Sequence, residues 1–285
     1  MEIARTKAEI RRLVGVAKKA GQTVGFVATL GALHGGHMSL IERARKETDF
    51  VVVSIFLNPT QFGTDDDLDE YPRQEEKDLA LCEKAGVDAV FAPSVEQMYR
   101  SEHCTVVKVE GLAEKLCGAN RPGFFAGVST VVAKLFNIVG PDVAYFGQKD
   151  AQQGLIIKQM AEELDMAIEV RMCPTVREDD GLAMSSRNIY LDQKQRRQAS
   201  CLYRALQEGK KLIESGQVDR DKVTAAMERI IKQAGPCSID YVAAVDSQSL
   251  EPATAENRSW LLALAVRIGR SRLIDNIVVE IPGPR

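Results

Sequence analysis

The chain has 285 residues, of which 45% are hydrophobic and 27% charged, as expected of a globular protein with a full core. Its formal net charge of −3 argues against a nucleic-acid-binding surface, and no hydrophobic run is long enough to span a membrane. The six cysteines contain no CxxC pair, which favours reduced thiols in a cytoplasmic protein over a disulfide framework. The length favours two domains.

Strand-like and helical patterns alternate along roughly the first 175 residues. Predicted strands cover 24–29, 51–57, 88–92, 143–146 and 168–173, and predicted helices cover 38–48, 73–85, 128–139 and 151–164. The run at 51–57 is hydrophobic throughout, as in a strand that is covered on both faces. The alternation predicts an α/β protein with a Rossmann-like, doubly wound parallel sheet and a ligand site at the carboxyl ends of its strands.

The pattern changes after Asn188. Two amphipathic helices are expected over 193–215 and 219–234, followed by three strands over 239–245, 261–268 and 273–280. Such an arrangement does not extend a doubly wound sheet. We therefore predict a first, Rossmann-like domain over 1–176 and a smaller α+β domain over 177–285.

Two histidines, His34 and His37, lie in a glycine-bearing turn between the first predicted strand and the helix that follows it. The first N–H groups of a helix lack partners and attract anions, so imidazoles placed there suit a site that stabilises phosphate charge. The alternatives are a metal pair or ordinary polar residues of a turn. A zinc site needs further ligands, and His103 is the only other histidine, so we predict no protein metal site.

Three more segments carry polar groups where the predicted sheet has loops. Gln61 follows the second strand in the segment 58–63, and its amide can both donate and accept hydrogen bonds. The segment 146–153 offers a lysine for phosphate and an aspartate for a ribose hydroxyl, and 184–188 offers two hydroxyls and a guanidinium. Each also has a plainer interpretation: an ordinary turn, a helix cap or a polar linker.

The order of these motifs resembles that of the pantothenate synthetases (pantoate–β-alanine ligases), within the nucleotidylyltransferase superfamily that carries HxGH. The matching segments are HGGH (34–37), NPTQF (58–62), YPR (71–73), LCG (116–118), RPG (121–123), KLFNIV (134–139), GQKD (147–150), PTVREDDGLAMSSRN (174–188), LLALAVRIG (261–269) and RLIDN (272–276). The resemblance implies a homodimeric ligase that joins pantoate to β-alanine with ATP and Mg²⁺ through a pantoyl-adenylate.

The resemblance also implies that 1–176 is the ATP- and pantoate-binding domain, that the second domain carries the MSSR loop (184–187), and that individual residues have particular roles. His37, His34, Lys149 and Arg187 are expected to be catalytic, and Gln61 and Gln153 to contact the substrates. The expected ATP-binding residues are Leu30, Gly31, Ala32, Leu33, His34, Gly35, Gly36, His37, Gly147, Gln148, Lys149, Asp150, Val176, Met184, Ser185, Ser186 and Arg187.

Three residues depart from the family pattern: Ala28 and Leu30 stand where Pro and Met are usual, and Phe124 where His is usual. These departures leave open the alternative of a protein with attenuated activity that binds ATP or pantoate. A second alternative is another nucleotidyltransferase that carries HxGH. The acidic run 65–70 is expected to be a solvated loop that supplies no metal ligand, and its position between the NPTQF and YPR segments suits a cover over the site.

Overall fold

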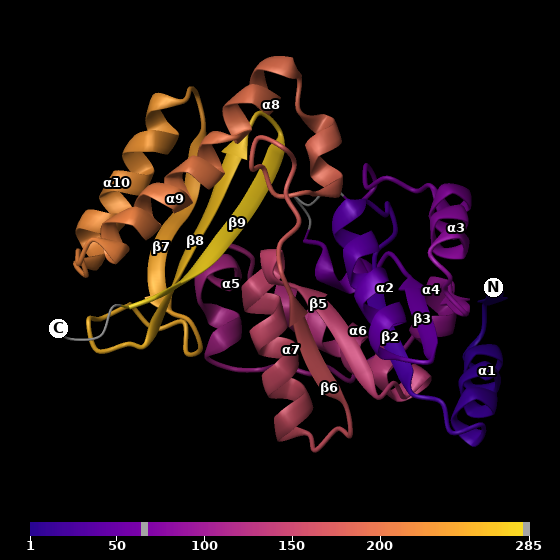
Figure 1. Cartoon of the computed structure of the whole chain (residues 1–285). Helices are drawn as coiled ribbons and strands as arrows, with labels where there is room; N and C mark the ends of the chain where they lie inside the picture. The colour runs from indigo at the N-terminus through magenta and orange to yellow at the C-terminus, as the bar shows by residue number, and fades with distance from the viewer. Residues whose placement is uncertain (64–67, 282–285) are drawn as a thin grey trace. The chain divides into compact units, whose positions relative to one another are not determined.

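The computed structural model describes residues 1–63 and 68–281 (Figure 1). Contacts divide the chain into two compact units. The first comprises 1–114, 121–148 and 153–174, and the second comprises 115–120, 149–152 and 175–285. The predicted division of the chain into domains at 176/177 stays a prediction. Residues 65–67 of the acidic run lie outside the described residues.

The first unit contains a six-stranded parallel sheet, whose strand order is β1-β4-β3-β2-β5-β6 (Figure 1). Its strands are β1 (Glu2–Ala4), β2 (Val24–Thr29), β3 (Phe50–Ile55), β4 (Ala89–Phe91), β5 (Val143–Gly147) and β6 (Glu169–Cys173). Central strands β2 and β3 are largely buried, which explains their continuous hydrophobic sequences. The predicted α/β class and parallel sheet are confirmed.

Helices cover both faces of this sheet. They are α1 (Lys7–Lys19), α2 (Gly35–Glu47), α3 (Glu75–Lys84), α4 (Val95–Met98), α6 (Phe124–Val139) and α7 (Ala151–Glu163). Residues of α2 and α3, such as Ile41 and Cys82, share a buried cluster with Val27 of β2. On the other face, Phe136 of α6 packs edge-on against Phe26 of β2, and α6 contacts α1. Successive side chains of β2 therefore pack against helices on opposite faces of the sheet.

The sequence interpretation missed β1 and α1 at the start of the chain. Strand β1 has only three residues, too few to show a periodic pattern. Helix α1, however, begins with a capping box, in which the Thr6 side chain accepts from the Glu9 N–H and the Glu9 carboxylate accepts from the Thr6 N–H. The Thr-x-x-Glu spacing is typical of a capping box and could have indicated the start of this helix.

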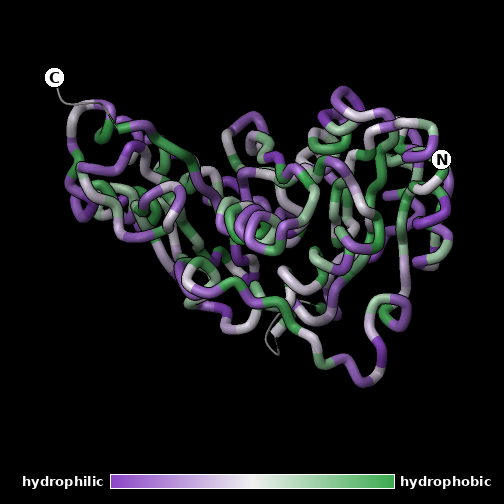
Figure 2. Tube along the Cα trace, turned by 90° about the horizontal axis from the view of Figure 1, so that it is seen from below, coloured by the Kyte–Doolittle hydropathy of each residue, from purple (hydrophilic) through white to green (hydrophobic). Residues whose placement is uncertain are grey.

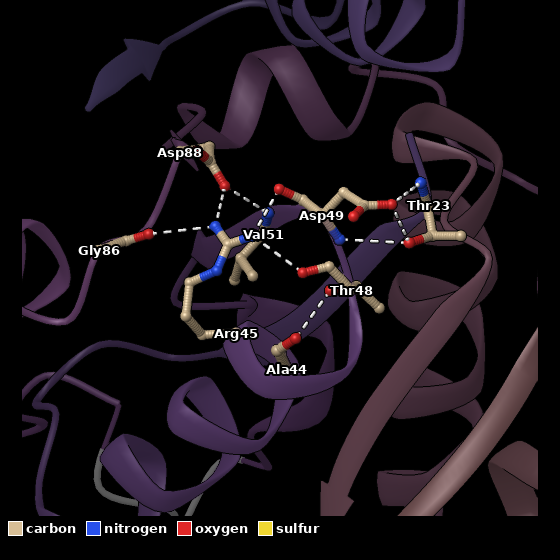
Figure 3. A network of polar contacts seen from close by, with 8 residues as sticks. All are labelled: Thr23, Ala44, Arg45, Thr48, Asp49, Val51, Gly86 and Asp88. Atoms are coloured by element: carbon tan, nitrogen blue, oxygen red, sulfur yellow. Dashed lines mark hydrogen bonds and ion pairs between the residues drawn. The ribbon is translucent and has the colours of Figure 1, made fainter. Parts of the chain in front are cut away.

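The amino ends of the strands are joined by a network of polar contacts (Figure 3). The guanidinium of Arg45, on α2, donates to Asp88 Oδ2 at 2.5 Å and to the Thr48 carbonyl at 2.8 Å. Asp49 Oδ2 accepts from the backbone N–H of Thr23 at 2.9 Å and from its hydroxyl at 2.7 Å. These bonds satisfy polar groups just before β2, β3 and β4 begin.

The second unit holds an antiparallel sheet in the order β7-β8-β9 and three longer helices. Its main elements are β7 (Ser238–Asp246), β8 (Ser259–Ile268), β9 (Ser271–Glu280), α8 (Gln193–Ala199), α9 (Cys201–Glu214) and α10 (Arg220–Gln233), together with the short helix α5 (Leu116–Asn120). Trp260 of β8 is fully buried in its core. The smaller α+β part is confirmed, but the single predicted helix over 193–215 is wrong, because it is divided at Ser200.

Hydrophobic stretches follow the interior strands of the unit that holds the N-terminus, and hydrophilic stretches follow its outer turns (Figure 2). None of the helices within 1–63 and 68–281 combines the length and hydrophobicity of a membrane span. All six cysteines are free thiols.

Candidate active site

The turn after β2 is held by a buried carboxylate that the sequence interpretation did not include. Asp78, on α3, is 1% exposed and accepts from the backbone N–H groups of Ala32 and Leu33, each at 2.8 Å. Gly31 and Ala32 have φ of 84° and 52°, and a positive φ is strained for alanine. The two bonds to Asp78 therefore stabilise a backbone conformation that places His34 at the start of α2.

His34 and His37 lie together at this helix start, with ring centroids 4.1 Å apart. His34 is the N-cap residue, and its Nδ1 accepts from the Gly36 N–H at 3.1 Å, while His37 Nδ1 accepts from the His34 N–H at 3.3 Å. An imidazole whose Nδ1 accepts carries its neutral-form proton on Nε2. Both rings therefore have Nε2–H as their donor. A Cβ on Gly36 would lie 2.9 Å from the His34 ring, so any larger residue at this position would displace that ring.

Gln61 lies in a short 3₁₀ helix, η1 (Pro59–Gln61), that follows β3. Its side-chain Oε1 accepts from Asn58 Nδ2 at 3.1 Å, and Asn58 is fully buried. Asn58 Oδ1 accepts in turn from the Tyr99 hydroxyl at 2.8 Å. With its oxygen engaged by Asn58, the Gln61 amide has its NH₂ group to offer to a substrate. A Cβ on Gly127 of α6 would lie 2.2 Å from the Thr60 carbonyl oxygen, so the helix packs directly on η1.

The GQKD segment forms a 3₁₀ turn, η3 (Gln148–Asp150), between β5 and α7. Gly147 ends β5, and Gln153 lies partly exposed on α7. The Lys149 side chain is 20% exposed, and its Nζ lies 3.6 Å from Asp150 Oδ2. The backbone carbonyl of Lys149 accepts from Asn276 Nδ2 at 2.9 Å, so the C-terminal RLIDN motif holds this turn.

Within the second unit, the segment 174–188 doubles back on itself. The Met184 N–H donates to the Val176 carbonyl at 3.0 Å, and Arg177 pairs with Ala183 in an isolated bridge. Ser185 then caps the 3₁₀ helix η4 (Ser186–Tyr190) by accepting from the Arg187 N–H at 3.3 Å. The fold thus brings together predicted ATP-binding residues from both ends of this segment.

A buried ion pair supports the same segment. Arg177 donates to both oxygens of Asp275, at 2.6 and 3.0 Å, and lies 4.0 Å from the centroid of the Tyr203 ring. Burial raises the pKa of Asp275, and the Arg177 guanidinium opposes that shift. A buried bidentate pair fixes geometry more than it adds stability. Asp275 and Asn276 therefore position the backbone on which Val176 and Lys149 lie.

The structure places the predicted residues in two sets, one in each unit. The first set comprises Leu30, Gly31, Ala32, Leu33, His34, Gly35, Gly36, His37, Gln61, Gly147, Gln148 and Gln153, and the second comprises Lys149, Asp150, Val176, Met184, Ser185, Ser186 and Arg187. Sequence reasoning missed the residues that support them, namely Asp78, Asn58 and Asp275. Asn58 and Asp275 lie inside motifs that were noted, whereas Asp78 gave no local signal because its partners are 45 and 46 residues away.

Across the described residues, no group of three or more His, Cys, Asp or Glu side chains could hold a metal ion.

Comparisons with known proteins agree on one family. The profile of the family described as Pantoate-beta-alanine ligase matches residues 2–278. The chain is similar to the pantothenate synthetases of Moorella thermoacetica (53% identity, 99% of each chain) and Pelotomaculum thermopropionicum (52% identity, 98% of this chain and 99% of the relative).

Solved structures extend this similarity to the fold. Pantothenate synthetase from Thermus thermophilus has 44% identity and a TM-score of 0.92, over 97% of this chain and 99% of that one. Pantoate-beta-alanine ligase from Francisella tularensis, in complex with beta-gamma ATP and beta-alanine, has 34% identity and a TM-score of 0.82, over 98% and 97%. With its sheet, its histidine turn and these similarities in agreement, the chain belongs to the pantoate–β-alanine ligase, or pantothenate synthetase, family of enzymes.

Proposed function

We propose that this chain condenses (R)-pantoate with β-alanine to give pantothenate, with conversion of ATP to AMP and pyrophosphate. The observation that carries the proposal is the His34–His37 pair at the start of α2, on a turn fixed by Asp78. Membership of the family supplies the substrates.

The reaction proceeds in two steps. A carboxylate oxygen of pantoate attacks the α-phosphorus of ATP, the bond to the β-phosphate breaks, and pyrophosphate leaves. The amine of β-alanine then attacks the acyl carbon of the pantoyl-adenylate, loses a proton, and AMP leaves. Neither step needs a covalent bond to the protein, so positioning and charge stabilisation carry the catalysis.

The donors of the first unit suit the leaving pyrophosphate. His34 and His37 each present Nε2–H, and their nearness lets both contact one triphosphate. We assign His37 as the donor whose bond strengthens most as the α–β bond breaks. Lys149 and Arg187 supply positive charge to the phosphates, and Ser185 and Ser186 supply hydroxyl donors.

The remaining assignments concern recognition. The Gln61 NH₂ group is directed by Asn58 and donates to pantoate and then to the pantoyl group as β-alanine attacks. Gln153 gives a further contact to pantoate. Backbone and side-chain groups bind the adenosine and the β- and γ-phosphates, at positions Leu30, Gly31, Ala32, Leu33, Gly35, Gly36, Gly147, Gln148, Asp150, Val176 and Met184.

Mg²⁺ belongs to the proposal as a companion of ATP. We expect the phosphate oxygens to be its main ligands, because Mg²⁺ in such sites is coordinated largely by substrate phosphates and water. We assign no step of the protein's chemistry to the metal. The homodimer and the cytoplasmic location remain predictions.

Pyrophosphate exchange into ATP tests the first step by itself. Exchange that requires pantoate, followed by pantothenate formation once β-alanine is added, supports the proposal. Exchange with a mononucleotide or a phosphopantetheine in place of pantoate would assign the chain to another nucleotidyltransferase activity. Absence of exchange with any carboxylate would instead support the alternative of an attenuated protein that binds ATP or pantoate without joining substrates.

Gln61→Ala tests the recognition assignment. Exchange and transfer of the pantoyl group from preformed adenylate to β-alanine should both fall, because one amide serves both. Asn58→Ala should reproduce part of this loss, since the Gln61 amide would then lose the donor that orients it. An effect of Gln61→Ala confined to the KM for ATP would remove Gln61 from the acyl pocket.

A further inference from the structure

A pocket of about 440 Å³ lies on the first unit. It is lined by α1, by α6 and by the extended segment 103–107. Pockets that bind small molecules commonly have volumes of about 300–1,000 Å³. None of the predicted ATP-binding or substrate-binding residues lines it, so the pocket is distinct from the site proposed above.

The charge of this pocket has one sign. Lys7 and Arg11 reach it from α1 and Lys134 from α6, and none of the described residues that line it is Asp or Glu. Burial lowers the pKa of Lys134, and the positive charges of Lys7 and Arg100 lower it further. Like charges held together in a concave, partly desolvated place repel one another until an anion neutralises them.

Polar and hydrophobic groups divide the rest of the lining. The Thr130 hydroxyl accepts from the Val107 N–H at 2.9 Å, which fastens the segment 103–107 to α6. Asn137 and Thr105 add further polar groups. Val107, Ala133 and Ile138 form a hydrophobic wall beside them. The lining therefore suits a ligand with an anionic group and a compact hydrophobic part.

We propose that this pocket binds a small organic phosphate, with its phosphate against Lys7, Arg11 and Lys134 and its carbon skeleton against the wall formed by Val107, Ala133 and Ile138. A phosphate dianion matches a lining with three cations better than a carboxylate does, because it carries more charge and three acceptor oxygens. The site does not depend on the proposed ligase activity.

Phenyl phosphate is a suitable probe, since it combines a phosphate with one flat hydrophobic group. Calorimetric titration of the whole protein should show saturable binding. Lys134→Gln and Arg11→Gln should each weaken it at least about tenfold, because each removes a charge-assisted donor. Arg11 is exposed, so its variant remains folded even where Lys134→Gln loses stability. Thermal unfolding of each variant verifies the fold.

Two further variants separate this pocket from the nucleotide site. Lys158→Gln makes the same charge change on the exposed face of α7, and His37→Ala alters the phosphate donors of the turn. Both should leave the affinity for phenyl phosphate within about twofold of the unaltered protein. Loss of binding in His37→Ala with retention in Lys134→Gln would place the probe at the nucleotide site and overturn the proposal, as would equal affinities in all variants.

Inorganic phosphate tests the second half of the assignment. It should bind more weakly than phenyl phosphate, because it cannot use the hydrophobic wall. Equal affinities for the two probes would overturn the assignment to an organic phosphate.

Discussion

The two edges of the parallel sheet use the same kind of side chain for opposite purposes. At the amino edge, the Asp49 carboxylate accepts two bonds from Thr23, and Arg45 joins Asp88 to the neighbouring loops (Figure 3). At the carboxyl edge, the Asp78 carboxylate also accepts two bonds, but from a turn with positive φ that precedes the histidines. One carboxylate joins loops, and the other holds a strained backbone in the conformation that the site needs.

The difference shows where an α/β sheet can hold strain. Polar groups at the amino edge satisfy one another, so that edge contributes to stability alone. The carboxyl edge has a fully buried carboxylate whose partners are backbone N–H groups, and the positive end of α2 lies beyond it. The comparison predicts that substitutions at the carboxyl edge affect turnover and that matched substitutions at the amino edge do not.

The largest effect is expected for His37→Ala. Loss of one preorganised donor to developing phosphate charge costs about 10²–10³ in rate. Pantoate-dependent pyrophosphate exchange measures it, while the affinity for β-alanine should change little. His103→Ala, the same substitution at the third histidine, should keep exchange within about twofold. Near-normal pyrophosphate exchange in folded His37→Ala would show that His37 does not take part in the first step of the reaction.

Asp78→Asn tests whether the turn needs its carboxylate. An amide oxygen can accept from only one side of the pair, and the amide NH₂ would then face a backbone N–H, which leaves a buried donor unsatisfied at a cost of about 1–3 kcal/mol. Displacement of the histidines should also lower the kcat of exchange about 10–100-fold, with a smaller change in the KM for ATP.

Asp49→Asn is the matched control, because this exposed carboxylate also accepts two hydrogen bonds. It should leave the kcat of exchange unchanged. A similar loss of kcat in Asp78→Asn and Asp49→Asn would contradict the prediction that only the carboxyl edge of the sheet affects turnover.

Arg45→Met should have a smaller effect, confined to stability. The change removes the bonds to Asp88 and to the Thr48 carbonyl, and net losses for partly exposed hydrogen bonds are about 0.5–1.5 kcal/mol. Chemical denaturation measures this change in the free energy of unfolding. A fall in exchange rate without a fall in stability would contradict the assignment of this edge to stability alone.

The smallest effect is a difference in titration between the two aspartates. Burial raises the pKa of Asp78 despite the bonds from Leu33 and Ala32, whereas the bonds from Thr23 lower the pKa of exposed Asp49. As pH rises from the unfolded-state pKa through the raised pKa of Asp78, its contribution to stability falls. The contribution of Asp49 is present above the unfolded-state pKa and is lost as pH falls through its own lowered value. Carboxyl ¹³C shifts should follow the two groups, and an Asp78 pKa below that of Asp49 would contradict this explanation.

Much of the fold could be predicted because its signals are local. The hydrophobic runs of β2 and β3 and the periodicity of α2 are properties of short segments. The division of the predicted helix over 193–215 at Ser200 was missed, since the helical pattern runs on through it. The candidate site was recognised from the order of motifs along the whole chain, which no single segment supplies.

The sequence alone therefore determined the class of sheet, the positions of most strands and the family. Hydrophobic periodicity and the order of motifs can be read from the chain without knowing which residues are in contact. Only the tertiary structure decided that Asp78 holds the turn, that Asn58 directs the Gln61 amide and that Asp275 pairs with Arg177. Except for the short Asn58–Gln61 contact, these are bonds between segments 45 to 98 residues apart. Such partners share no local pattern, and the packing of helices and strands alone brings them within hydrogen-bonding distance.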